Sequence, residues 1–130
     1  MLNALSKEKL QIVLNADTEF RFASRYWDGA IQLDLGDLVY VLRLKAGEVV
    51  SVDSTRIDGT KQGEVGISAT VSDWNLLLEK FPRPFYQDFY PASMHHSFVL
   101  SGDSDYIWAY YAALRRCGQI MRIIVSSEEK

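Results

Sequence analysis

The sequence predicts an α+β domain in which helices pack on one face of a mostly antiparallel five-stranded sheet. Apolar and polar residues alternate through residues 30–52 and 67–71, which is the period of half-buried strands. Apolar residues recur at three- and four-residue steps near both ends of the chain, which is the period of amphipathic helices. A length of 130 residues, 48% of them hydrophobic, suits one domain with a single core. Because helices flank the strands in sequence, we expect them to gather on one sheet face.

We divide this single domain, residues 1–130, into four segments. They are N-terminal helices at 1–28, a four-strand meander at 29–72, a helix plus an aromatic insertion at 73–97, and the last strand with a C-terminal helix at 98–125.

The first segment is expected to contain two short packing helices. Ser6 can cap the first and Asp17 the second, since both side chains can accept a hydrogen bond from a first-turn amide. Large rings supply most of the buried area of a small domain, so three aromatic side chains here are assigned to packing: Phe20, Phe22 and Trp27.

The second segment begins as a three-strand meander. Gly-Asp at 36–37 and Ala-Gly at 46–47 supply tight turns between consecutive strands. Residues 53–63, DSTRIDGTKQG, are polar and rich in turn formers, so we interpret them as a solvated loop without chemistry. The second strand carries Val39 and Val41 on its other face, which indicates a sheet side for a homodimer.

Prolines divide the third segment. Ser72 or Asp73 is expected to cap its helix, and Pro82 to end it, because a residue before proline is excluded from the helical region. Pro84 suits the first turn of a further short helix, which Pro91 would then end.

The fourth segment is predicted to form a strand at 98–101, a turn at Gly102 and one long helix capped by Asp103. The helix has an apolar stripe that includes Cys117. Its other side carries three arginines, which we assign to a solvated surface: Arg115, Arg116 and Arg122.

Composition limits the partners and the compartment. A net charge of −3 and a pI near 5.3 argue against nucleic acid and against an anionic membrane surface. No apolar run is long enough to cross a bilayer. Cys117 is a single cysteine, and the N-terminal residues lack a signal-peptide pattern, so we expect a cytoplasmic protein.

The stretch 81–102 is the strongest candidate for a site. It contains all three prolines, four of the six phenylalanines and both histidines. We expect a pocket, or a lid over one, to be built from this stretch. Its candidate lining residues are Trp74, Arg83, Phe85, Phe89, Met94, Phe98, Trp108 and Tyr111, with Arg83 placed to receive an acidic headgroup.

Acid–base catalysis is the alternative for the same stretch. Histidine titrates near neutral pH, so His95 or His96 together with Asp88 can move a proton on an apolar substrate, helped by Tyr86 or Tyr90. The two histidines could instead have a purely structural role, and this interpretation stays open beside the catalytic one. The spacings H-x-x-x-H and C-x-x-C are missing from the sequence, so no metal site is expected.

Three passages resemble the sterol carrier protein family: AIQLDLGDLVYVLRLKAGEVVSV, VGISATVSDWNLLLEK and LSGDSDYIWAYYAALRR. They lie within residues 29–116, and the second is the most specific, as a strand leading into a serine-aspartate cap and a leucine-rich helix. The resemblance implies a helix layer over a five-stranded sheet and an apolar cavity that holds a lipid-like molecule without covalent chemistry or a cofactor. Where the family has a short turn, this chain has the longer RPFYQDFYPASMHH.

These observations lead to three functional hypotheses. The first is non-catalytic binding or carriage of a small hydrophobic or amphipathic molecule. The second is a small cofactor-free enzyme that uses Asp88 and the histidine pair. The third is an interaction or dimerisation module whose interior is filled by side chains.

Overall fold

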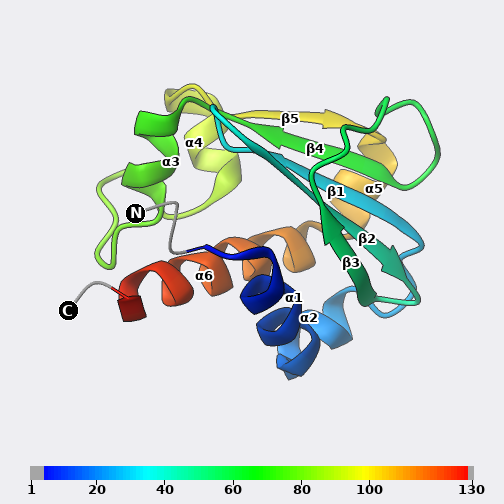
Figure 1. The fold of residues 1–130 in the computed structure, drawn as a ribbon. Helices are drawn as coiled ribbons and strands as arrows, with labels where there is room; N and C mark the ends of the chain where they lie inside the picture. Colours follow the sequence, from blue (N-terminus) through cyan, green and yellow to red (C-terminus); the bar gives the residue numbers. More distant parts are fainter. Residues whose placement is uncertain (1–4, 129–130) are drawn as a thin grey trace.

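The computed structural model describes residues 5–128, so both ends of the predicted domain, residues 1–4 and 129–130, lie outside the described residues. Figure 1 shows a sheet with α1, α2 and α6 on one face. The helices are α1 Lys7–Ala16, α2 Thr18–Ala23, α3 Val71–Leu77, α4 Phe89–His95, α5 Ser104–Ala109 and α6 Tyr111–Glu128. The strands are β1 Gly29–Asp34, β2 Val39–Lys45, β3 Glu48–Asp53, β4 Glu64–Ser68 and β5 Val99–Gly102. The predicted α+β class and its five-stranded, mostly antiparallel sheet are confirmed.

The sheet has the strand order β3-β2-β1-β4-β5. The pairs β1–β2, β2–β3 and β4–β5 are antiparallel, whereas β1 and β4 are parallel. The predicted continuous meander over 29–72 therefore stops after β3. Parallel neighbours cannot be joined by a tight turn, so the chain must cross from the β3 edge over β2 and β1 to reach β4.

That crossing is made by the β3–β4 loop, residues 54–63, on the face opposite the helices (Figure 1). Ile57 packs there against Val39 and Val41, which are 6% and 0% exposed. The loop is also fixed by a hydrogen bond of 2.9 Å from the Ile57 amide to Gln32 Oε1. Most residues of the loop are exposed, as predicted for a solvated loop, but Ile57 anchors it to the sheet. The surface suggested for a homodimer is therefore already covered by the chain itself.

Both predicted N-terminal caps are confirmed. The side chain of Ser6 accepts a hydrogen bond from the Lys9 amide, and that of Asp17 accepts one from the Phe20 amide. The core lies between these helices and the sheet, where Leu10, Leu14 and Phe20 are fully buried.

The predicted caps of the middle helices need correction. Thr70 caps α3 by accepting from the Asp73 amide, so the helix begins before Ser72. α4 begins after Asp88, and Pro91 lies inside its first turn instead of ending it. Proline is tolerated there because first-turn amides have no intrahelical acceptor.

The predicted single C-terminal helix is two helices separated at Tyr110. The ring of Tyr110 stacks on that of Trp27, with centroids 5.0 Å apart and an interplanar angle of 18°. The break allows α5 to pack against β4 and β5 while α6 packs against α1 and α2. The predicted cap at Asp103 is confirmed, and the apolar stripe of α6 is buried.

Two of the three arginines assigned to a solvated surface have structural roles. Arg116 binds Asp17 through two hydrogen bonds of 2.9 and 3.0 Å, which joins α6 to the cap of α2. Arg122 is half-buried and donates to the backbone carbonyl oxygens of Leu77 and Tyr86 at 2.7 and 3.1 Å. Of the three, Arg115 alone has a largely exposed side chain, at 53%.

Candidate functional site

The aromatic stretch forms the α3–α4 loop and α4, at one end of the molecule, and β5, which runs from there along the sheet edge toward α5 (Figure 1). Its inner layer is part of the core. Trp74, Phe89 and Phe98 are at most 2% exposed, and their ring centroids lie 5.0 to 6.0 Å apart. The Trp74 indole donates to the Asp34 carbonyl oxygen at 2.7 Å. Three of the predicted lining residues therefore pack on one another in this structure.

An outer aromatic layer lies on α4, α5 and the start of α6. Trp108 is 58% exposed and contacts two tyrosine rings, Tyr90 at 5.5 Å and Tyr111 at 5.9 Å between centroids. Met94, one helical turn after Tyr90 on α4, is also exposed. We call these four side chains, Tyr90, Met94, Trp108 and Tyr111, the aromatic seam.

The aromatic seam is tied together at the first turns of α4 and α6. The Tyr90 amide donates to Tyr111 Oη at 2.7 Å. Burial, together with the nearby charge of Asp88, raises the pKa of Tyr111 well above its ordinary value, so its hydroxyl is protonated at neutral pH. Asp88 caps α4 and forms an ion pair of 3.4 Å with Arg115.

The two histidines stack on two consecutive aromatic rings. The His95 ring lies 3.7 Å from that of Phe85, and the His96 ring lies 3.8 Å from that of Tyr86. Phe85 adopts a φ of 68°, in the left-handed region that costs an aromatic residue about 1–2 kcal/mol. The stacking of Phe85 and Tyr86 on His95 and His96 holds this conformation.

Next to Tyr86 lies the carboxylate of Asp73, which the sequence indicated only as a possible helix cap. Asp73 accepts hydrogen bonds from Tyr86 Oη at 2.7 Å and from the Ser97 amide at 2.9 Å. Burial alone would raise the pKa of Asp73, but these bonds and the nearby His96 lower it below its ordinary value. Burial and the bond to Asp73 raise the pKa of Tyr86 to about 12. The Nε2 atom of His96 is buried without a hydrogen-bond partner among the described residues.

His96 of the predicted acid–base group therefore lies near Asp73, and not near Asp88 as predicted. Asp88 and the histidines lie at opposite ends of α4, whose seven residues rise about 10 Å. Tyr86 is in contact with both other groups, with His96 by ring stacking and with Asp73 by a hydrogen bond. Asp73 was interpreted as a helix cap, and nothing in its local sequence reveals this contact across 13 and 24 positions.

The remaining predicted residues are peripheral or inert. Arg83 is exposed and forms an ion pair of 3.5 Å with Glu79. Cys117 is buried, and burial raises the pKa of its thiol to about 12, as in an unreactive core cysteine. Among the described residues, no cluster of three or more histidine, cysteine or acidic side chains is arranged to hold a metal ion.

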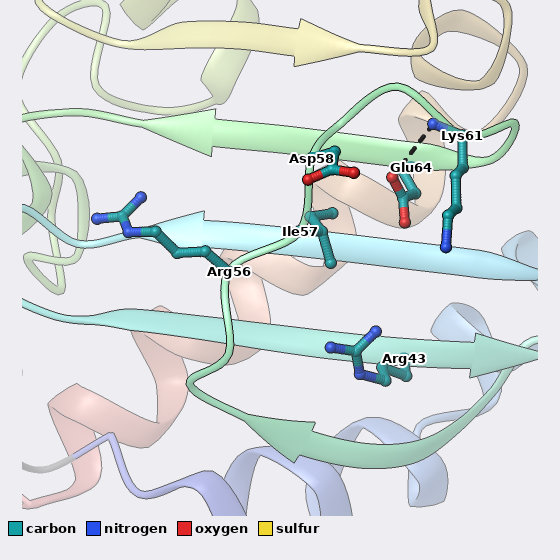
Figure 2. A pocket seen from close by; sticks show the side chains of 6 residues that line it. All are labelled: Arg43, Arg56, Ile57, Asp58, Lys61 and Glu64. Atoms are coloured by element: carbon teal, nitrogen blue, oxygen red, sulfur yellow. Dashed lines mark hydrogen bonds between the residues drawn. The ribbon is translucent and has the colours of Figure 1, made fainter.

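A second candidate site lies on the outer sheet face, under the β3–β4 loop. It is a pocket of about 200 Å³ lined by Arg43, Arg56, Ile57, Asp58, Lys61 and Glu64 (Figure 2). Five of these six side chains are charged. We call it the outer-face pocket. The sequence placed no chemistry here, because the pocket requires the loop to fold back over β1 and β2.

No known protein family matches this sequence, and no curated protein shows significant sequence similarity to it. Its fold, in contrast, is shared with several solved structures. A crystal structure of sterol carrier protein 2 matches with a TM-score of 0.69 and 19% identity, over 90% of this chain and 95% of that chain. The solution structure of a conserved hypothetical protein from Thermus thermophilus, described as possibly a sterol carrier protein, matches with a TM-score of 0.57 and 20% identity, over 85% of this chain and 80% of that chain.

A third solved structure, of the ubiquinone synthesis protein UbiJ-SCP2, matches with a TM-score of 0.55 and 14% identity, over 88% of each chain. The chain therefore has the sterol carrier protein fold, as its three motif passages predicted. Within residues 5–128, no helix is both long and apolar enough to span a membrane.

Proposed function

We propose that the protein binds and carries a small hydrophobic or amphipathic molecule between its sheet and its helices. The observation that carries this proposal is the sterol carrier fold, which extends over 90% of the chain. The aromatic seam adds support, since exposed Trp108, Tyr90 and Met94 on adjoining helices form the kind of surface that apolar ligands meet first.

The route we propose for the ligand runs between α4 and α6. The inner layer is packed, so an apolar molecule enters only if α4 moves away and takes Phe89 with it. The Phe89 ring packs closely against Gly118 of α6. A Cβ atom at position 118 would press against this ring. The polar ties to be released are the Tyr90 amide to Tyr111 Oη and the ion pair of Asp88 with Arg115. The ion pair is partly exposed, so breaking it costs at most about 1 kcal/mol.

The test is binding of a pyrene-labelled fatty acid, followed by fluorescence. Trp108→Ala should weaken binding about tenfold, which corresponds to about 1.4 kcal/mol. Phe22→Ala is the matched control. Phe22 was assigned to packing from the sequence, but it is 66% exposed on α2, against 58% for Trp108, and it is not part of the aromatic seam. Equal effects of the two substitutions would contradict the proposal. A protein that binds no probe would support the filled interaction module instead.

The loading rate provides an independent test of the route. Asn caps helices as well as Asp does, so Asp88→Asn keeps the α4 cap and removes only the charge pair with Arg115. We expect the probe to enter the variant several-fold faster at an affinity within about twofold of wild type. An unchanged entry rate would show that α4 is not the moving element.

Acid–base catalysis on an apolar substrate is our second candidate. It is favoured by the contact of His96 with Tyr86, whose hydroxyl is hydrogen-bonded to Asp73. In this arrangement His96 exchanges the proton, and Tyr86, whose hydroxyl donates to Asp73, positions the His96 ring by stacking on it. His96→Gln should abolish turnover of any substrate that is found, while His95→Gln, which alters the neighbouring stack, should not.

We also propose a cytoplasmic location. The single cysteine, Cys117, is buried and leaves the chain without an intrachain disulfide. Cell fractionation with a tagged chain tests this directly.

A further inference from the structure

We infer that the outer-face pocket binds a small molecule that carries both an ammonium and an anionic group. The pocket lies on the sheet face away from the helices, so it is separate from the hydrophobic site proposed above. Its walls come from β2, β4 and the β3–β4 loop (Figure 2).

Glu64 is the residue that points most directly to a ligand. It is only 8% exposed, although it carries a carboxylate and lines the pocket. Within residues 5–128, its carboxylate accepts one hydrogen bond, from the Lys61 amide at 3.3 Å. An ionised carboxylate offers about four acceptor positions, and those that no donor of the chain fills remain available to a molecule in the pocket. A donor from outside the chain would satisfy them.

Two further charged side chains of the pocket, both on exposed residues, form no ion pair among the described residues. Neither the Asp58 carboxylate nor the Lys61 ammonium forms a side-chain hydrogen bond or an ion pair there. The two arginines differ, since Arg43 pairs with Asp53 at 2.9 Å and Arg56 pairs with Asp34 at 3.1 Å. The unpaired groups are therefore two carboxylates and one ammonium.

These charges are separated in space. Figure 2 shows the carboxylates of Asp58 and Glu64 on one side of the pocket and the guanidinium group of Arg43 on the opposite side, with Lys61 reaching in between. An ammonium group of the ligand would lie against Glu64 and Asp58, and its anionic group against Lys61 and Arg43. A molecule with only one charge is attracted at one side and repelled at the other.

The size of the pocket narrows the ligand class. A volume of about 200 Å³ is below the 300–1,000 Å³ that is usual for drug-sized ligands. The side chain of Ile57 is the one apolar group in the lining, which suits a short aliphatic spacer. A short aminocarboxylate meets these requirements.

The test is a titration followed by amide resonances of residues 56–64. The probes are glycine, β-alanine and 4-aminobutyrate, with butylamine and butyrate as analogues that keep one charge. We expect at least one aminocarboxylate to bind with a Kd of about 1 mM or tighter, and both single-charge analogues to bind about tenfold more weakly. Butylamine binding as well as 4-aminobutyrate would overturn the inference, as would the failure of all three aminocarboxylates to shift these resonances.

Three variants complete the test. Glu64→Gln should weaken binding about tenfold or more, and Lys61→Met several-fold. Glu48→Gln is the control, because Glu48 is an exposed carboxylate on β3 outside the pocket. If Glu64→Gln fails to fold, Lys61→Met still decides, since Lys61 is exposed and its side chain forms no hydrogen bond or ion pair within residues 5–128. Unchanged binding in both pocket variants would refute the assignment.

Discussion

Arg122→Met is expected to loosen the aromatic stretch from α6. The guanidinium group donates to the Leu77 carbonyl oxygen from both Nε and Nη2, at 3.0 and 2.7 Å, and Nη2 also reaches the Tyr86 carbonyl oxygen at 3.1 Å. One side chain thereby joins α6 to the end of α3 and to the segment that precedes α4. Methionine keeps much of the apolar stem but none of the donors.

The magnitude follows from the burial of these bonds. A hydrogen bond to a charged group contributes about 1.5–3 kcal/mol, and removing a donor leaves the carbonyl groups unsatisfied. Because the bonds share one side chain and are not additive, we expect a loss of about 3 kcal/mol from the free energy of unfolding. Arg115→Met, on the same helix, removes a 53% exposed side chain from an ion pair of 3.4 Å and should cost at most about 1 kcal/mol.

Urea unfolding monitored by circular dichroism measures both losses. Hydrogen exchange should show faster opening in residues 86–95 of the Arg122 variant, with little change in β1 and β2. Equal destabilisation by the two substitutions would refute the reasoning. It would mean that the hydrogen bonds from Arg122 stabilise the fold no more than the exposed ion pair of Arg115 does.

The remaining predictions concern contacts that fix the core and the loop. Asp17→Asn keeps the cap of α2 but removes the charge that Arg116 binds, so it should cost about 1–2 kcal/mol at pH 7 in urea unfolding. The hydrogen bonds from Arg116 lower the pKa of Asp17 in the folded protein. This stabilisation is therefore fully present above the unfolded pKa of about 3.9, and it is lost as the pH falls through the folded value. The variant and the wild type should converge in acid, and a gap that persists once the pH is below the folded pKa of Asp17 would contradict the charge argument. Tyr86→Phe should cost about 1–2 kcal/mol and raise the pKa of Asp73 as measured by carboxyl NMR, whereas an unchanged pKa would show that the hydroxyl does not hold that carboxylate. Ile57→Ala should cost about 1–2 kcal/mol and expose the loop to proteolysis, since Ile57 is half-buried. Resistance equal to wild type would mean that other contacts hold the loop.

Local patterns were sufficient to predict most of the fold. The caps at Ser6, Asp17 and Asp103 depend on side chains that act within a few residues, and all three are confirmed. The tight turn at 46–47 is also local, since Ala46 and Gly47 both take positive φ values of 48° and 78°. The sequence pattern therefore predicted those helix starts and turns whose stabilising contacts lie within one helical turn or one hairpin.

The errors arose where distant packing decides. The break at Tyr110 depends on Trp27, which lies far earlier in the chain and leaves no mark on the helical period. The path of the β3–β4 loop depends on the parallel pairing of β1 with β4, which strand periodicity does not reveal. Arg122 has the spacing of a surface residue, yet carbonyl groups from two other segments surround its guanidinium.

The contacts among the candidate site residues were predicted only in part. Phe85 with His95 and Trp108 with Tyr111 are in contact, as convergence of the aromatic segment and the last helix would require. The partner of the histidine cluster is Asp73, not Asp88, because the α3–α4 loop returns the chain to the start of α3. That return is a tertiary event which no spacing in the sequence encodes.

The central claim, that this fold carries a hydrophobic molecule, is tested most directly by native mass spectrometry of the purified protein. We expect an additional mass that disappears on organic extraction, and a stability that rises when the extracted molecule is restored. The rise should be about 2.7 kcal/mol when the free ligand is about a hundredfold above its Kd. A protein that is always free of ligand, and whose unfolding no lipid or hydrophobic metabolite shifts, would contradict the account.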